Sequence, residues 1–175
     1  MLRYNTITSP DINNGLGCRL TIWISGCSHR CPGCHNRELW DYNNGKQLFS
    51  KEVIDKISKE LNLKSYIDGI TLCGGDPLDQ SDGDLMQLTN FLIELKMNVK
   101  RKFNIWIYAG DIYENLVQYD SKLNVLKQCD VLVDGPYEQD KRDITLAFRG
   151  SSNQRIIDLN KSLDKWKVVT LDLDK

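Results

Sequence analysis

Three cysteines lie within eight residues of this 175-residue chain, at Cys27, Cys31 and Cys34, and no other feature constrains the fold as strongly. The loop that carries them, Gly26–Asn36, also contains glycine and proline, which favour turns. The six cysteines of the chain could form disulfides only in an oxidising compartment, whereas a tight group indicates metal or redox chemistry. We therefore expect a fold in which three neighbouring thiols face one metal centre.

The composition favours one globular domain, which we expect to span residues 1–175. Because the formal net charge is only -1, the chain offers no electrostatic reason to expect a nucleic-acid partner. No apolar stretch approaches the roughly 20 residues of a membrane helix. The segment Met1–Asn5 also lacks the apolar core of a signal peptide. We therefore expect a cytoplasmic protein with no membrane partner.

Short β-rich runs alternate with helical patterns, and this alternation predicts an α/β fold with a mostly parallel sheet. Buried strands are expected at residues 19–25, 69–73, 103–108 and 130–134, with two further candidates at residues 155–159 and 167–171. Ser50 is placed to cap one helix, and Asp82 or Asp84 a second. The apolar residues that share a face are Val53, Ile54, Ile57 and Leu61 in the first helix, and Leu85, Leu88, Leu92 and Leu95 in the second.

Two motifs directly follow predicted strands, where parallel α/β folds collect their ligands. The cysteine loop follows the strand at residues 19–25, and Gly74-Gly75-Asp76-Pro77 follows the strand at residues 69–73. Two glycines let the backbone approach a ligand closely. The carboxylate of Asp76 has two interpretations: it contacts that ligand, or it lies at the N-terminus of the following helix as a cap.

Three thiolates are one fewer than a closed 4Fe-4S electron carrier uses, so one iron of such a cluster would lack a protein ligand. An open coordination position usually indicates chemistry rather than a structural role. The C-x3-C-x2-C spacing of Cys27, Cys31 and Cys34 strongly resembles that of the radical S-adenosylmethionine (SAM) superfamily. The resemblance implies that the open iron binds SAM, and that an electron from the cluster splits SAM into methionine and a 5'-deoxyadenosyl radical.

The resemblance extends to the glycine pair and to the fold. Gly74-Gly75-Asp76-Pro77 resembles the GGEP motif of radical SAM enzymes, with Asp in place of Glu, which implies contacts to the SAM amino group. The expected cofactor-binding residues are Gly33, Cys34, His35, Gly74, Gly75 and Asp76. The chain is short for a full barrel, so the resemblance implies a partial, open (β/α) barrel of the radical SAM type, with a mostly parallel sheet.

Three further segments narrow the resemblance: Asn14–Arg19, Val133–Tyr137 and Phe148–Arg155. With the two motifs they resemble the activating proteins of anaerobic ribonucleoside-triphosphate reductases, a family in which glycine commonly precedes the third cysteine, as Gly33 does here. The resemblance implies that the chain generates a glycyl radical on the large subunit of that reductase. It also implies an electron donor such as flavodoxin or ferredoxin.

Two alternatives remain open at the level of sequence. His29 or His35 could complete a Cys3His zinc site with the three loop cysteines, giving a non-enzymatic module. A small radical SAM enzyme that acts on a free metabolite, such as a deazapurine-forming enzyme, would share the cluster. Such an enzyme predicts a polar substrate pocket rather than a face for docking a protein.

Several residues outside the two motifs could have either a structural or a functional role. Trp106 and Tyr108 are expected to pack in the core rather than against SAM. The polar turn at residues 150–154 binds either a ligand or the local backbone. The cysteines expected to pack as small apolar residues are Cys18, Cys73 and Cys129.

Overall fold

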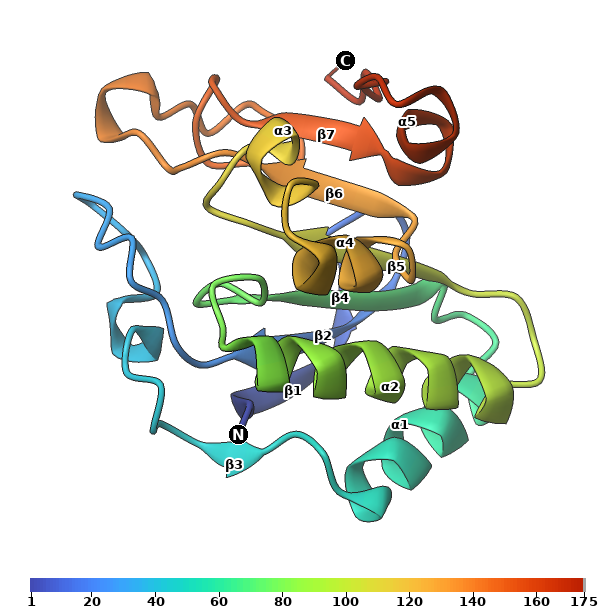
Figure 1. Cartoon of the computed structure of the whole chain (residues 1–175). Coiled ribbons are helices and arrows are strands. Elements are labelled where there is room, and N and C mark those ends of the chain that lie inside the picture. Colours follow the sequence, from blue (N-terminus) through green and yellow to red (C-terminus); the bar gives the residue numbers. More distant parts are fainter. Residues whose placement is uncertain (175) are drawn as a thin grey trace.

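The computed structural model describes residues 1–174, and these residues form an α/β fold on one open sheet (Figure 1). Seven strands of the described part pair in the order β3, β1, β2, β4, β5, β6, β7. Their bounds are β1 (Arg3–Asp11), β2 (Arg19–Ile24), β3 (Lys46–Gln47), β4 (Gly69–Gly74), β5 (Asn104–Tyr108), β6 (Val131–Asp134) and β7 (Arg155–Asp158). Lys175, the last residue of the predicted domain, lies outside the described residues.

The helices alternate with the strands in the middle of the chain, as the sequence pattern predicts. Their bounds are α1 (Lys51–Leu63), α2 (Asp82–Asn98), α3 (Tyr113–Leu116), α4 (Asp120–Leu126) and α5 (Leu159–Lys165), with short 3-10 helices η1 (Arg37–Leu39) and η2 (Gln139–Lys141). Ser50 caps α1 as expected, accepting from the backbone N–H of Val53 at 3.2 Å. The cap of α2 is Ser81, so neither Asp82 nor Asp84 has that role; the serine is one residue closer to the preceding loop and has an extended backbone.

The parallel part of the sheet is its centre. Strands β2, β4, β5 and β6 pair in parallel, whereas β1, β3 and β7 pair antiparallel at the two sides. The sheet is open, and a barrel is not confirmed. The predicted strand at residues 155–159 is confirmed as β7, but the candidate at residues 167–171 is wrong: it contributes an isolated bridge between Thr170 and Ile157.

Strand β1 was not expected because its sequence is mostly polar and contains Pro10. Proline lacks a backbone N–H and is tolerated where one side of a strand is unpaired. That condition holds here, because β3 pairs only with Arg3 and Tyr4 and leaves the far end of β1 without a neighbour on that side. A strand that contains a proline and few apolar residues lacks the sequence pattern by which strands are predicted.

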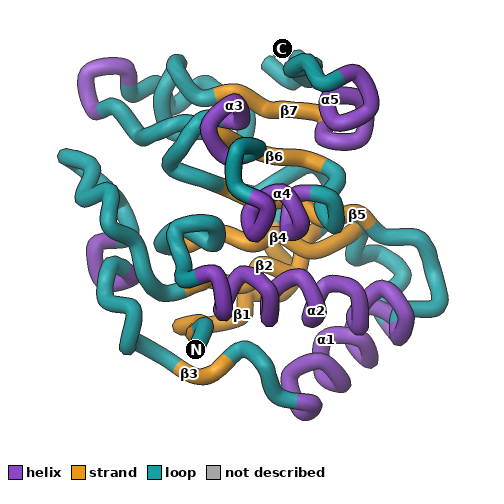
Figure 2. The backbone as a smooth tube through the Cα atoms, in the orientation of Figure 1, coloured by secondary structure: helices purple, strands orange, loops and turns teal. Residues whose placement is uncertain are grey.

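The two faces of the sheet have different roles. Figure 1 shows α1, α2 and α4 in front of the same face, where the side chains of Ile22, Leu72 and Ile107 are fully buried in the main core. Side chains alternate along a strand, so Trp23 and Tyr108 lie on the opposite face. In Figure 2 the loops that follow β2, β4 and β6 reach the same end of the sheet, and these loops carry the predicted motifs.

Candidate functional site

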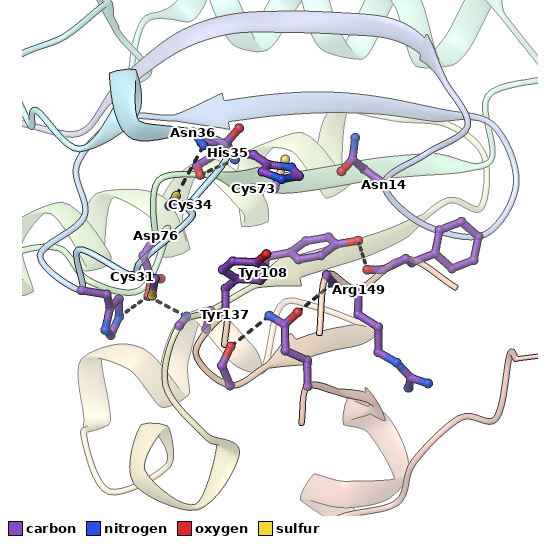
Figure 3. A pocket seen from close by; sticks show the side chains of 18 of the residues that line it. Asn14, Cys31, Cys34, His35, Asn36, Cys73, Asp76, Tyr108, Tyr137 and Arg149 are labelled. Atoms are coloured by element: carbon purple, nitrogen blue, oxygen red, sulfur yellow. Dashed lines mark hydrogen bonds and ion pairs between the residues drawn. The ribbon is translucent and has the colours of Figure 1, made fainter. Parts of the chain in front are cut away.

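A cavity of about 550 Å³ lies at the carboxyl ends of the parallel strands. Its walls come from five separate parts of the chain: the loop between β1 and β2, the cysteine loop after β2, the glycine pair after β4, the end of β5, and the loops after β6. Figure 3 shows labelled side chains from each of these parts around the cavity. The expectation that both motifs meet at one edge of the sheet is confirmed.

The three loop cysteines all line this cavity. The loop is held to the segment after it by backbone hydrogen bonds, from Gly26 to the carbonyl of Leu39 at 2.8 Å and from Cys27 to the next carbonyl at 3.2 Å. Burial raises the pKa of the Cys27 thiol to about 11, and burial also raises the pKa of the Cys31 thiol. Without metal these two thiols are protonated at neutral pH, so binding a metal centre must release their protons.

Asn36, which follows the third cysteine by two residues, joins the cysteine loop to the glycine pair. Its backbone N–H donates to Cys34 Sγ at 3.4 Å, and its side-chain Nδ2 donates to the carbonyl of Gly74 at 2.9 Å (Figure 3). Asn36 was not among the residues predicted to belong to the site. Its position directly after the cysteines, with two donors available, was the signal that could have found it.

The backbone of the glycine pair lies close to the cysteine loop, and not only to the cavity in which a ligand was expected. The backbone N–H groups of Gly75 and Asp76 donate to the carbonyls of Ile24 and Gly26, at 2.8 and 2.9 Å. A Cβ added at Gly75 would lie only 2.5 Å from the carbonyl oxygen of Gly26. Any larger residue at position 75 would therefore push the two motifs apart.

Asp76 is a buried junction between three segments. Its side chain, in a residue that is 2% exposed, accepts from the backbone N–H groups of Leu78 and Gly110, each at 2.8 Å, and contacts His29 Nε2 at 2.9 Å. The hydrogen bond to this carboxylate raises the pKa of His29. The capping interpretation is wrong, because α2 begins after Ser81 and takes its cap from that residue.

Five of the six residues predicted to bind the cofactor line the cavity: Cys34, His35, Gly74, Gly75 and Asp76. Gly33 has a left-handed backbone, with φ +73, and lies beneath a neighbouring side chain. A Cβ at this position would lie 1.8 Å from Gln139 Oε1, the end of a flexible side chain that could move aside. The left-handed backbone, which side chains rarely adopt, therefore favours glycine there more than packing does.

The structure places the two aromatic residues of β5, Trp106 and Tyr108, in different surroundings. Trp106 is 3% exposed and packs edge-on against Phe148 with ring centroids 5.5 Å apart, as expected of a core residue. Tyr108 lines the cavity, and its hydroxyl donates to the carbonyl of Phe148 at 2.7 Å. Cys73 and Cys129 are buried, as predicted, but Cys73 also lines the cavity.

The zinc alternative gains no support from the arrangement of the donors. Within residues 1–174, the one group of three such donor atoms within 4.8 Å of one another is Cys27, His29 and Asp79. It contains only one of the three loop cysteines, and His29 Nε2 is already in contact with a carboxylate. A Cys3His set around a single ion is therefore not assembled.

The donor set does fit a 4Fe-4S cluster. Thiolates that bind different irons of one cluster stand farther apart than donors that share a single ion. Cys27, Cys31 and Cys34 face one cavity from one loop, and the cavity has the volume of a cofactor pocket. Space therefore remains beside the thiols for a further ligand.

Comparison with known proteins agrees with this geometry. The chain matches the family described as a 4Fe-4S single cluster domain over residues 13–157. It is 38% identical over 155 residues to the anaerobic ribonucleoside-triphosphate reductase-activating protein of Enterobacteria phage T4, covering 89% of this chain and 93% of that protein. Proteins of the same name from Salmonella typhi and Escherichia coli (strain K12) are 40% and 38% identical, each covering 87% of this chain and 96% of the relative. Among residues 1–174, no helix has the length and apolar character to cross a bilayer.

Proposed function

This chain belongs to the family of anaerobic ribonucleoside-triphosphate reductase-activating proteins, and from that premise we propose that it generates a glycyl radical on such a reductase by reductive cleavage of SAM. One observation carries the proposal. Three thiols in the loop after β2 and the glycine pair at the end of β4 line one cavity of about 550 Å³, which has room for a cluster and a further ligand. A closed electron carrier would need a fourth protein ligand and would need no such space.

The residues of the cavity have distinct roles in this proposal. Cys27, Cys31 and Cys34 hold the 4Fe-4S cluster through their thiolates. When bound, the cluster and SAM supply the electron and the sulfonium C–S bond whose cleavage yields a 5'-deoxyadenosyl radical. Cys34 and His35 on one wall, and Gly74, Gly75 and Asp76 on the other, would contact the SAM molecule between them. Gly33 lies outside the cavity lining and would act through the turn that it forms before Cys34.

Asp76 acts in this site mainly through its position. Its carboxylate already receives two backbone N–H groups and faces His29, so it keeps the cysteine loop and the ends of β4 and β5 at a fixed separation. A fixed separation matters because the two walls must present their groups to one ligand at the same time. The walls also replace water around the reacting atoms.

The proposed partner is the large glycyl-radical subunit of the reductase. We infer that the open sheet corresponds to a partial (β/α) barrel of the radical SAM type, and that its open side admits the glycine-bearing segment of that subunit. Hydrogen abstraction from the glycine Cα would leave a stored backbone radical on the partner. The proposed electron donor is a flavodoxin or ferredoxin, and the proposed location is the cytoplasm.

The test is an electron paramagnetic resonance experiment on the protein with its cognate reductase. Reduced, cluster-loaded protein, SAM and reductase are mixed without oxygen, and we expect a glycyl doublet together with 5'-deoxyadenosine. Omission of SAM is the control and should remove both signals. SAM cleavage with no doublet at any reductase concentration would contradict the proposal and favour an enzyme that acts on a free metabolite.

A further inference from the structure

The polar turn at residues 150–154 binds a neighbouring loop through its side chains, and the proposed function leaves it without a role. Asn153 Nδ2 donates to the carbonyl of Pro136 at 2.7 Å, and Gln154 Nε2 donates to the carbonyl of Gly135 at 3.0 Å. The two carbonyls belong to successive residues in the loop after β6. The turn therefore grips the backbone of residues 135–139, which we call the Tyr137 loop.

A third contact from the turn lies on the other side of Tyr137. The hydroxyl of Ser151, which is fully buried, accepts from the backbone N–H of Glu138 at 3.2 Å. The ring of Tyr137 itself packs against Gly150, where an added Cβ would lie 3.1 Å from Cδ2. Side chains of the polar turn thus hold the backbone both before and after Tyr137.

The Tyr137 loop in turn covers the cysteine loop. The Gln139 side chain lies directly over Gly33, where its Oε1 would be 1.8 Å from an added Cβ, and the Tyr137 ring centroid is 6.1 Å from that of His35. The Tyr137 hydroxyl donates to Gln139 Oε1 at 2.8 Å, which fixes the two side chains to each other.

We propose that Ser151, Asn153 and Gln154 are positioning residues for the iron-sulfur cluster: they hold the Tyr137 loop against the cysteine loop. Hydrogen bonds to cluster sulfurs and exclusion of solvent both set the reduction potential of such a cluster. Water near a cluster stabilises its reduced, more negative state, so a loop that excludes water lowers the potential. This inference goes beyond the proposed function, because it requires only the cluster and not SAM cleavage or the reductase.

The hydrogen bonds of Gln154 argue against a role of this side chain as a direct ligand, although it lines the cavity. Its Oε1 accepts from the backbone N–H groups of Gly150 and Ser151, at 2.9 and 3.2 Å, while its Nε2 serves the Tyr137 loop. Both ends of this amide are therefore engaged within the protein. The partners expected for this turn were a ligand or the local backbone, and the structure adds the backbone of a second loop.

The test compares Asn153→Ala with Asn62→Ala, a matched control. Asn62 also donates Nδ2 to a backbone carbonyl, that of Asn98 at 3.1 Å, but it does so between α1 and the end of α2. Both full-length variants are loaded with iron and sulfide, and the midpoint potential is measured without SAM. We expect a less negative potential in Asn153→Ala, because a loosened Tyr137 loop lets water reach the cluster, and no shift in Asn62→Ala.

Ser151→Ala provides a second measurement that needs no cluster. It leaves the N–H of Glu138 without its acceptor, so hydrogen exchange at this amide in the metal-free protein should accelerate roughly five- to tenfold, the factor expected for one hydrogen bond. Unchanged exchange at Glu138 would overturn the inference. An unchanged potential in Asn153→Ala, with weaker binding of SAM, would also overturn it and would make the turn a SAM contact.

Discussion

Two cavities of nearly equal volume lie at opposite ends of the parallel strands, about 550 Å³ at the carboxyl ends and about 520 Å³ at the amino ends. Volume therefore does not distinguish the candidate site from the rest of the molecule. The difference lies in the polar groups around each cavity. At the amino ends the carboxylates accept hydrogen bonds from backbone N–H groups, whereas at the carboxyl ends the three loop thiols remain available.

The amino-end cavity is lined by carboxylates whose oxygens are already engaged. Asp68 accepts from the backbone N–H of Cys18 at 2.8 Å, and Asp130 accepts from that of Ile105, also at 2.8 Å. Asp158 caps α5. These carboxylates accept from backbone N–H groups at or near the starts of β2, β5 and α5. The acidic character of this cavity follows from that structural role.

Arg19 fills the floor between the amino ends of the strands. It is fully buried, and burial lowers its pKa to about 10. Its guanidinium donates to Thr71 Oγ1 at 3.1 Å and to Asn104 Oδ1 at 2.6 Å, and it also lies over the ring of Trp106 at 5.7 Å. The buried charge of Arg19 has hydrogen-bond partners on several strands and so stabilises the sheet. The thiols of the cysteine loop face a cavity instead, and this difference distinguishes the candidate site.

The largest expected effect is at the carboxyl end. Replacement of Cys27, Cys31 or Cys34 by Ala removes one of three cluster ligands, so we expect loss of bound 4Fe-4S iron and complete loss of SAM cleavage. Iron content, absorbance of the reconstituted protein and 5'-deoxyadenosine yield measure the effect. The matched control is Cys18→Ala, a half-buried thiol outside the loop, which should retain both properties. Turnover in any of the three loop variants would contradict the assigned ligand set.

A large effect of a different kind is expected at the amino end. Arg19→Met should lower the free energy of unfolding by about 2–4 kcal/mol, because several buried acceptors lose their donor at once. Denaturant titration of the metal-free protein measures this loss. Iron bound per folded molecule should be unchanged. If this variant lost its cluster while keeping its stability, the separation between the two ends would be wrong.

Asp76→Asn tests whether a residue of the candidate site both stabilises the fold and positions the two walls of the cavity. It replaces an acceptor oxygen by a donor beside the N–H of Gly110, so we expect a loss of about 1–3 kcal/mol in the free energy of unfolding. Because Asp76 also joins the two walls through His29, SAM binding should weaken in the same variant. Thermal unfolding and equilibrium binding of SAM to the loaded protein test the two parts separately. A normal affinity for SAM would show that Asp76 does not position the walls.

The smallest effect is expected at an exposed ion pair near the carboxyl end. Arg155 binds both oxygens of Glu114, at 3.0 and 2.7 Å, and these hydrogen bonds hold the pKa of Glu114 below its ordinary value. A lowered pKa stabilises the folded state above the unfolded pKa, and this contribution is lost as pH falls through the folded pKa. Glu114→Gln should therefore cost less than about 1 kcal/mol at pH 7, because the pair is exposed, and the difference should vanish in acid. Unfolding free energies of both proteins from pH 7 downward would check the sign.

Much of the candidate site could be predicted because its parts are local in sequence. The spacing of the cysteines predicts a ligand set within one short loop. The alternation of β-rich and helical patterns predicts parallel strands, whose carboxyl ends must lie together. These two facts place the glycine pair beside the cysteines without any knowledge of side-chain contacts.

The remaining features depend on contacts between distant residues. Arg19 meets Asn104 across 85 positions of sequence, and Asp76 meets Gly110 across 34. No local pattern states that Gln139 lies over Gly33, or that Asn153 holds the carbonyl of Pro136. The sequence by itself determined which groups can bind a cluster and at which end of the sheet they lie. Only the tertiary structure decided which of the surrounding polar groups are already paired, because pairing depends on the packing of loops that the chain brings together from far apart.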